Sequence, residues 1–232
     1  MRLKAIIFDV DGTLAETEET HRVAFNRAFA EGGLEWHWTQ DEYRALLTTT
    51  GGKERIGRYL GECGHDPDAA LIARLHARKN AFYAAFVADG AILPRAGMIR
   101  LIEEARHENI RLAIATTTSR MNVSALLSTA FPGQAQAFSV IVTGEDVDHK
   151  KPHPEVYQRA LAELALGPAA CVAIEDSRNG LDAALGAGLR TIITPSYYTI
   201  GERFTGADIV VECSVRSENL TLSRIIRAFE AH

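Results

Sequence analysis

The 232-residue sequence has few cysteines and no long apolar run. Its three cysteines, Cys63, Cys171 and Cys213, are odd in number and far apart, which argues against a disulfide framework and against a Cys-x-x-Cys metal site. No apolar run reaches membrane-spanning length, and the short apolar stretch at the start is followed at once by acidic residues, unlike a secretory signal. We therefore expect a cytoplasmic protein without a membrane partner.

The sequence also lacks an excess of basic residues, since its formal net charge is -5. A general nucleic-acid-binding protein needs a broad basic surface, so we expect no nucleic-acid partner. Hydrophobic residues make up 47% and charged residues 24%, near the averages for globular proteins, so neither disorder nor a fibrous class is favoured. The length suits one α/β domain with an insertion, or two small domains, and we expect a monomer.

Short apolar runs of strand length recur along the chain, and each ends near polar residues or Gly and Pro. They are residues 4–8, 112–115, 138–142, 171–174, 191–193 and 209–211. Apolar residues at three- and four-residue spacing predict helices over 98–107, 156–166 and 180–187. Strands that alternate with helices predict an α/β fold with a doubly wound, Rossmann-like parallel sheet.

One region departs from this alternation. Residues 17–89 show only helical periodicity, with breaks at Gly32-Gly33, at Gly51-Gly52 and over 61–67. We therefore predict a catalytic α/β core of residues 1–16 and 90–232, with an inserted α-helical cap domain of residues 17–89. Because the insertion follows the first strand, it should lie as a lid over the carboxyl ends of the strands, where open α/β sheets bind ligands.

Acidic residues end two of the predicted strands. Asp9 and Asp11 follow the first strand, and Glu175 and Asp176 follow a later one at what should be the same edge of the sheet. Each close pair of carboxylates would repel by about 4 kcal/mol at an effective dielectric near 20, so the cluster needs a cation. Hard oxygen ligands suit Mg2+. The alternatives are a solvated acidic turn and a helix N-cap formed by Asp176 or Ser177.

Lys151 precedes Pro152, which favours an extended backbone and can direct the lysine toward a phosphate. Pro154 could open the helix that begins near Glu155. The alternative is a solvated lysine in a proline-stiffened loop. Because Lys150 is its neighbour, the sequence also leaves open which of the two lysines reaches the phosphate.

A cluster of hydroxyl groups, Thr116, Thr117, Thr118 and Ser119, follows another predicted strand and precedes a helix. Helix starts with free N–H groups bind anions, although a simple N-cap is the alternative interpretation.

Together these motifs resemble those of the haloacid dehalogenase superfamily. The four motifs, in chain order, are Asp9-x-Asp11-Gly12-Thr13, the strand-end Thr116, Lys151 before Pro152, and Glu175-Asp176. The resemblance covers the whole core, and the helical insertion resembles the α-helical cap of that superfamily. Glu18, His21, Lys151-Pro-His-Pro and Glu175-Asp-Ser-Arg-Asn-Gly look most like the subfamily that contains β-phosphoglucomutase and the CbbY-type sugar-bisphosphate phosphatases.

The resemblance implies a covalent mechanism. Asp9 would be the nucleophile, since carboxylates serve as nucleophiles in aspartyl-phosphate enzymes, and Asp11 the general acid and then the base. Lys151 would neutralise negative charge, and Thr116 would hold phosphoryl oxygens. The implied Mg2+ ligands are Asp9, Asp11 through its main-chain carbonyl, and Asp176, with Glu175 behind them. A dehalogenase needs neither a proton donor nor a metal, so the Asp-x-Asp pair favours phosphate chemistry.

Candidate substrate contacts come from the cap and from the hydroxyl cluster. The first basic segment of the cap comprises Thr50, Gly51, Gly52, Lys53 and Arg55. The second comprises Arg74, His76, Arg78 and Lys79. The other candidates are Glu18 and His21 on the first cap helix, and Thr117, Thr118, Arg120 and Asn122 after the hydroxyl cluster. A solvated helix face is the alternative for both basic segments; if they face the catalytic site, they imply a second phosphate on the substrate.

Joined to the resemblance, these patterns predict a Mg2+-dependent phosphatase acting on a small phosphorylated sugar. The most specific expectation that the resemblance implies is hydrolysis of xylulose 1,5-bisphosphate to xylulose 5-phosphate. A β-phosphoglucomutase-like mutase is the alternative, but Glu54 stands near the place where that pattern has a lid arginine, and Arg55 follows it. A catalytically inactive binding module would have no reason to keep all the motif groups together.

Overall fold

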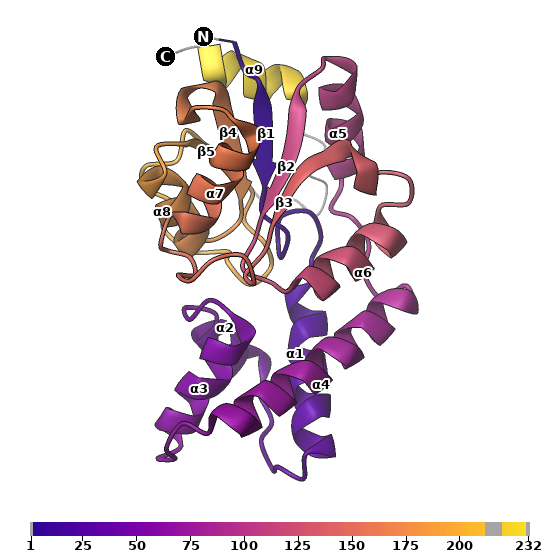
Figure 1. Cartoon of the computed structure of the whole chain (residues 1–232), viewed down its shortest axis with the longest axis vertical. Coiled ribbons are helices and arrows are strands. Elements are labelled where there is room, and N and C mark those ends of the chain that lie inside the picture. The colour runs from indigo at the N-terminus through magenta and orange to yellow at the C-terminus, as the bar shows by residue number, and fades with distance from the viewer. Residues whose placement is uncertain (1, 212–219, 231–232) are drawn as a thin grey trace.

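The computed structural model describes residues 2–211 and 220–230, so Cys213 lies outside the described residues (Figure 1). The strands are β1 (Ala5–Phe8), β2 (Arg111–Ala115), β3 (Phe138–Val142), β4 (Cys171–Glu175), β5 (Arg190–Ile193) and β6 (Ile209–Val210). They form one sheet in the order β3-β2-β1-β4-β5-β6, and every neighbouring pair is parallel. The predicted doubly wound α/β fold is confirmed.

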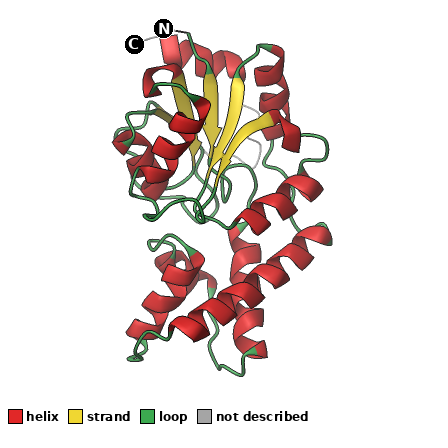
Figure 2. Ribbon diagram, in the orientation of Figure 1, coloured by secondary structure: helices red, strands yellow, loops and turns green. Residues whose placement is uncertain are grey.

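Helices cover both faces of the sheet (Figure 2). Ile6 and Phe8 of β1 contribute to an apolar core with α5 (Met98–His107), α6 (Arg120–Ala130) and α9 (Leu222–Glu230). Ala5 and Ile7 contribute to a second core with α7 (Glu155–Leu164) and α8 (Arg178–Gly186). Short 3-10 helices, η1 (Ala135–Ala137) and η2 (Pro168–Ala170), precede β3 and β4. Because side chains on both faces of β1 are buried, its sequence is continuously apolar rather than alternating.

Four helices of the N-terminal half lie below the carboxyl ends of the strands (Figure 1). They are α1 (Glu18–Glu31), α2 (Gln40–Leu46), α3 (Gly52–Glu62) and α4 (Ala69–Ala88). Phe25, Phe29, Trp38 and Tyr43 form a separate apolar core among them, with ring centroids as close as 4.7 Å. Tyr198 from outside the cap also packs in this core, and the cap boundaries at residues 17 and 89 stay a prediction.

One part of the cap differs from the expected helical pattern. Residues 34–39 are not helical, and this segment is fixed by the side chain of Asn26, which accepts a hydrogen bond from Trp38 N and donates one to Trp38 O. The segment delivers Trp38 into the cap core and ends at Thr39, whose hydroxyl caps α2. Among the helices of residues 2–211 and 220–230, none combines the length and apolar character needed to cross a membrane.

Candidate active site

The carboxylate of Asp9 lies at the end of β1, where its side chain is nearly buried. Its main-chain N–H donates to Ile174 O of the neighbouring β4, so the paired strands fix its position. Its Oδ1 lies 2.6 Å from Lys151 Nζ. Asp9 and Lys151 are thus brought into direct contact from positions 142 residues apart in sequence.

The structure distinguishes the two adjacent lysines. Lys151 Nζ donates to Asp9, to Glu175 Oε1 at 2.6 Å and to Ala115 O at 2.9 Å. Lys150 Nζ instead donates to the main-chain oxygens of Gly144 and Val147, within its own loop. Lys151 is therefore the lysine that reaches the strand ends, although Lys150 also borders the cavity below.

Three carboxylates surround this one ammonium group. Asp9, Glu175 and Asp176 are all buried, and each can place an oxygen within 4.8 Å of the others. Glu175 Oε1 also accepts a hydrogen bond from Tyr157 Oη at 2.5 Å. Three buried negative charges against one positive charge fit a bound divalent cation, because uncompensated buried charge is costly. Asp9 and Asp176 border the cavity, whereas Glu175 lies behind them and holds Lys151.

The pKa values of the clustered side chains also fit a bound divalent cation. Burial raises the pKa of Asp9 to about 7 against the opposing effect of Lys151. Burial, together with the charges of Asp9 and Glu175, raises the pKa of Asp176 well above its usual range. Burial acts to lower the pKa of Lys151, but Asp9 and Glu175 outweigh it and hold that pKa above its ordinary value. A divalent cation would favour the ionised form of both aspartates.

Asp11 has different partners from Asp9. Its Oδ1 accepts a hydrogen bond from Thr17 Oγ1 at 2.5 Å and lies 3.0 Å from His21 Nε2. Burial acts to raise the pKa of Asp11, but His21 and Thr17 outweigh it, so this pKa lies well below its usual range. Burial lowers the pKa of His21, and the ring stacks on Tyr83 at 4.0 Å between centroids.

The turn after Asp11 requires glycine. Gly12 has φ +81°, and a Cβ there would lie 2.2 Å from Asp176 Oδ2, so any side chain would displace the carboxylate. Arg95 fixes the same turn: it donates to Gly12 O, to Thr194 O at 2.7 Å and to Pro195 O at 2.8 Å. The sequence interpretation missed Arg95, because its partners are mostly main-chain carbonyls, with Glu16 as an ion-pair partner, and no sequence pattern identifies such contacts.

The hydroxyl cluster follows β2 as expected. Thr116 is 1% exposed, and its Oγ1 accepts a hydrogen bond from Thr118 N. Ser119 caps α6 by accepting from Asn122 N, so the N-cap interpretation holds for Ser119. Asn122 Nδ2 donates to Asn80 Oδ1 of α4 at 3.3 Å. Asn80, which the sequence interpretation missed, thereby links the cap to the core.

A cavity of about 1090 Å³ separates the strand ends from the cap. Of the predicted core-motif residues, Asp9, Asp11, Thr116, Lys151 and Asp176 border it. The predicted substrate contacts that also border it are Glu18, His21, Thr50, Gly51, Gly52, Lys53, Arg55, His76, Lys79, Thr117, Thr118 and Asn122. Ser177 lies at the same end of the sheet. Its hydroxyl accepts a hydrogen bond from Gly180 N and caps α8, so the alternative interpretation of Ser177 as a helix N-cap holds.

Three predicted substrate contacts lie elsewhere. Arg74 is exposed on α4 and does not border the cavity. Arg78 pairs with Glu31, its Nη2 donating to Oε1 at 2.7 Å, on the exposed surface of the cap. Arg120 Nη2 donates to Asp146 Oδ2 at 2.6 Å, again at an exposed position. Neither borders the cavity. Arg78 is adjacent to Lys79 in sequence, but successive side chains of a helix point about 100° apart. Arg78 therefore lies on a different face of α4 from Lys79.

The basic groups of the cap that face the cavity differ in their partners. Lys79 is 4% exposed, and its Nζ lies 4.9 Å from the centroid of Phe25. Burial lowers the pKa of Lys79 to about 7 and the pKa of His76 to about 3. Arg55 donates to Tyr43 Oη at 2.8 Å, and Tyr43 donates to Glu18. Among the residues that the structure describes, neither Lys79 nor Arg55 has a carboxylate within hydrogen-bonding distance, but Arg55 is held by Tyr43 and by Thr49 O.

The cap and the core also touch at the mouth of the cavity. Thr50 Oγ1 donates to Lys151 O, and Asn179 Nδ2 donates to Thr48 O at 3.1 Å. The residues before α3 therefore contact both the loop that carries Lys151 and the start of α8.

Comparison with known proteins agrees with this geometry. Residues 6–194 match the family model for haloacid dehalogenase-like hydrolases. Over 209 residues the chain is 53% identical to protein CbbY of Rhodobacter capsulatus. The match covers 90% of this chain and 92% of that protein.

Two solved structures show how far the likeness extends. A crystal structure of mutant CbbY from Rhodobacter sphaeroides with xylulose-(1,5)bisphosphate matches with a TM-score of 0.90 at 50% identity, over 95% of this chain and 98% of that one. β-Phosphoglucomutase from Clostridium difficile matches with a TM-score of 0.82 at 22% identity, over 99% and 98% of the chains, which shows the shared fold alone. The chain belongs to the haloacid dehalogenase-like hydrolase family and is a phosphatase of that family.

Proposed function

We propose that the chain is a Mg2+-dependent sugar-bisphosphate phosphatase that forms an aspartyl-phosphate on Asp9. The observation that carries the proposal is the composition of the cavity. Asp9, Asp11 and Lys151 border it on the core side, and Lys53 and Lys79 border it on the cap side. A substrate with phosphates at both ends would meet positive charge at both ends.

In the first step, a carboxylate oxygen of Asp9 attacks phosphorus, and the bond from phosphorus to the sugar oxygen breaks. Lys151, held by Glu175, offsets the negative charge of the attacking carboxylate and of the phosphoryl group. The hydroxyls of residues 116–118 border the cavity and would donate to the phosphoryl oxygens. The main-chain N–H groups of Thr116 and Thr118 already donate to Val142 O and to Thr116 Oγ1. Asp9 and Asp176 would hold Mg2+, which supplies further positive charge next to the phosphoryl oxygens when it is bound.

Asp11 transfers the protons of both steps. It donates a proton to the leaving sugar oxygen, and then takes one from the water that attacks phosphorus of the aspartyl-phosphate, which releases phosphate and restores Asp9. The low pKa of Asp11 keeps its carboxylate ionised, so it is in the form that can accept a proton in the second step. Its role as the acid of the first step requires that a bound substrate weaken the hydrogen bonds from Thr17 and His21, since both favour the ionised form.

The substrate assignment comes from the cap and from the relatives. Lys79 is a buried ammonium that faces the cavity, and a phosphate dianion would provide the partner that it lacks. The CbbY structure that contains xylulose-(1,5)bisphosphate is 50% identical to this chain. We infer that xylulose 1,5-bisphosphate is the substrate and that xylulose 5-phosphate and phosphate are the products.

The direct test is a screen of mono- and bisphosphorylated sugars with Mg2+ and with EDTA. We expect five-carbon bisphosphates to be preferred at least tenfold in kcat/KM, which is about 1.4 kcal/mol of transition-state stabilisation, and activity to be lost in EDTA. β-Glucose 1-phosphate should give phosphate rather than glucose 6-phosphate. Full activity after chelation, no preference for bisphosphates, or formation of glucose 6-phosphate would each contradict the proposal.

Lys79 should make the preference for bisphosphates depend on pH. The pKa of Lys79 in the folded protein is lowered to about 7, so the free enzyme loses this charge as the pH rises through 7. Since kcat/KM reports the free enzyme, the ratio of kcat/KM for the bisphosphate to that for the matching 1-phosphate should fall roughly 10- to 100-fold between pH 7 and pH 9. The ratio cancels titrations that affect both substrates.

The matched variants are Lys79→Met and Arg78→Met. Lys79→Met should give a low ratio that does not change with pH, whereas Arg78→Met should behave as wild type, because Arg78 pairs with Glu31 away from the cavity. A pH-dependent ratio that survives in Lys79→Met would remove Lys79 from the second phosphate site.

A further inference from the structure

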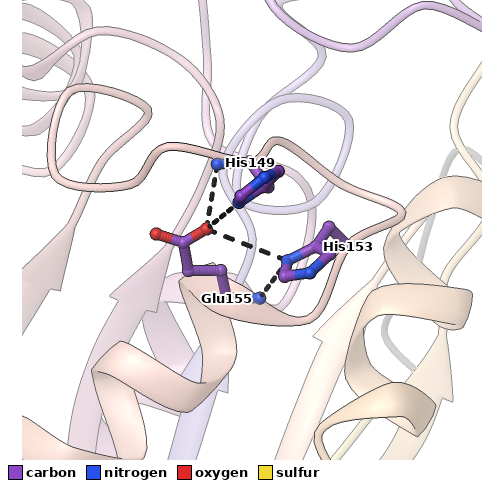
Figure 3. A group of neighbouring side chains, drawn as sticks. All are labelled: His149, His153 and Glu155. Atoms are coloured by element: carbon purple, nitrogen blue, oxygen red, sulfur yellow. Dashed lines mark hydrogen bonds and ion pairs between the residues drawn. The ribbon is translucent and has the colours of Figure 1, made fainter.

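A second group of potential metal ligands lies on the loop that carries Lys151. His149 and His153 come from the loop between β3 and α7, Glu155 is the first residue of α7, and the three side chains face one another (Figure 3). None of the three borders the active-site cavity. The proposed phosphatase reaction therefore makes no use of them.

The three ligand atoms lie within 4.8 Å of one another, and the distances from each histidine to Glu155 are close to what a single ion requires. His149 Nδ1 lies 2.9 Å and His153 Nδ1 lies 3.8 Å from Glu155 Oε2. Two ligands of a tetrahedral Zn2+, each about 2.1 Å from the ion, lie about 3.4 Å apart, so the observed distances fall on either side of the required value. The histidine side chains are 67% and 50% exposed, which leaves them room for the small rotation needed.

Glu155 is held in place for this role. Its carboxylate accepts hydrogen bonds from Asp148 N and His149 N, both at 2.9 Å. These bonds, with the His149 ring, lower its pKa to about 2, so the carboxylate is ionised across the neutral range. Main-chain donors that orient a carboxylate are a common feature of metal sites. A metal ion would replace the direct contact between His149 Nδ1 and Glu155 Oε2.

The positive charges nearby do not point at this group. Lys151 Nζ is turned inward to Asp9 and Glu175, and Lys150 Nζ is turned to the carbonyls of Gly144 and Val147. The N-terminus of α7 opposes a cation, but the helix dipole has only a small effect at exposed positions.

We propose that His149, His153 and Glu155 form a surface site for one transition-metal dication of the zinc class. Two imidazoles and one carboxylate suit Zn2+, Ni2+ and Cu2+, whereas Mg2+ prefers an all-oxygen set. Three protein ligands leave at least one coordination position for water. Because His149 and His153 stand two residues before and two residues after Lys151, a bound ion also restrains the loop that presents this lysine.

The test is calorimetric titration of the untagged full-length protein with Zn2+ in excess Mg2+, which competes for the acidic cluster at Asp9. We expect wild type to bind one more equivalent of Zn2+ than the double variant His149→Ala/His153→Ala, and either single variant to lose at least tenfold in affinity at that site. His65→Ala, which removes an exposed cap histidine, is the matched control and should bind as wild type. Equal stoichiometry and affinity in wild type and double variant would overturn the proposal.

A second measurement uses wild type alone. Of the eight histidines in the chain, two should show imidazole ¹⁵N shifts that change on addition of one equivalent of Zn2+. Each of the two signals should be missing from one of the single variants. Changes confined to other histidines, or no change at all, would contradict the site irrespective of how the variants fold.

Discussion

Asp9→Asn should abolish turnover. Asparagine keeps the shape of the side chain and an oxygen that can accept from Lys151, but it removes the nucleophilic carboxylate oxygen. Loss of a covalent nucleophile commonly costs far more than loss of a binding contact, and we expect kcat to fall by at least about 10⁴-fold. Steady-state release of phosphate from a sugar bisphosphate in Mg2+ measures this directly.

The matched control is Asp66→Asn, which makes the same chemical change at an exposed cap residue that does not border the cavity. Its activity should equal that of wild type. If Asp9→Asn kept even a tenth of wild-type kcat, Asp9 would be a ligand or a structural residue and the covalent route would fail.

Asp11→Asn should separate the two chemical steps. Asparagine can still accept from Thr17, but it can neither donate a proton to a leaving group nor take one from water. General acid–base catalysis contributes about 10²- to 10⁴-fold, so we expect kcat on a sugar bisphosphate to fall within that range. The variant leaves unchanged the side chains of Asp9 and Asp176, which would hold Mg2+, so the affinity for Mg2+ should change little.

p-Nitrophenyl phosphate gives the sharper version of this experiment, because its leaving group needs no proton. With this substrate Asp11→Asn should release one equivalent of nitrophenolate per enzyme in a rapid burst and then stall, since the aspartyl-phosphate is not hydrolysed. Steady release without a burst would show that some group other than Asp11 activates the water.

The fold could be predicted from the sequence because its signals are local. Each strand of the core is a short, continuous apolar run, since helices cover both faces of the sheet, and the strands over 138–142 and 171–175 lie within a residue of the predicted bounds. The helix over 98–107 matches its prediction. Residues 34–39 were missed because their conformation depends on a contact between Asn26 and Trp38, and no periodicity records such a contact.

The site was predictable where the topology alone brings residues together. Parallel strands all end at one edge, so acids that follow β1 and β4 must converge, whatever the cap does. Sequence could not choose between Lys150 and Lys151, because that choice depends on which side chain the turn directs inward. It also placed Arg78 and Arg120 in the cavity, where each instead pairs with a nearby carboxylate on the surface.

Arg95 and Tyr157 show a further limit. Arg95 binds main-chain carbonyls from two loops, and Tyr157 donates to Glu175 from inside α7. Both position catalytic groups without touching the cavity themselves, so neither belongs to a motif at a strand end. Side chains that only position catalytic residues can be identified only from the contacts in the structure.

The most direct test of the account is mass spectrometry of wild-type enzyme quenched in acid during turnover of a sugar bisphosphate with Mg2+. We predict that a fraction of the protein carries the mass of one phosphoryl group, and that fragmentation places the group on Asp9. Enzyme that shows no added phosphoryl group at any time in the turnover, or that carries it on a different residue, would contradict the account.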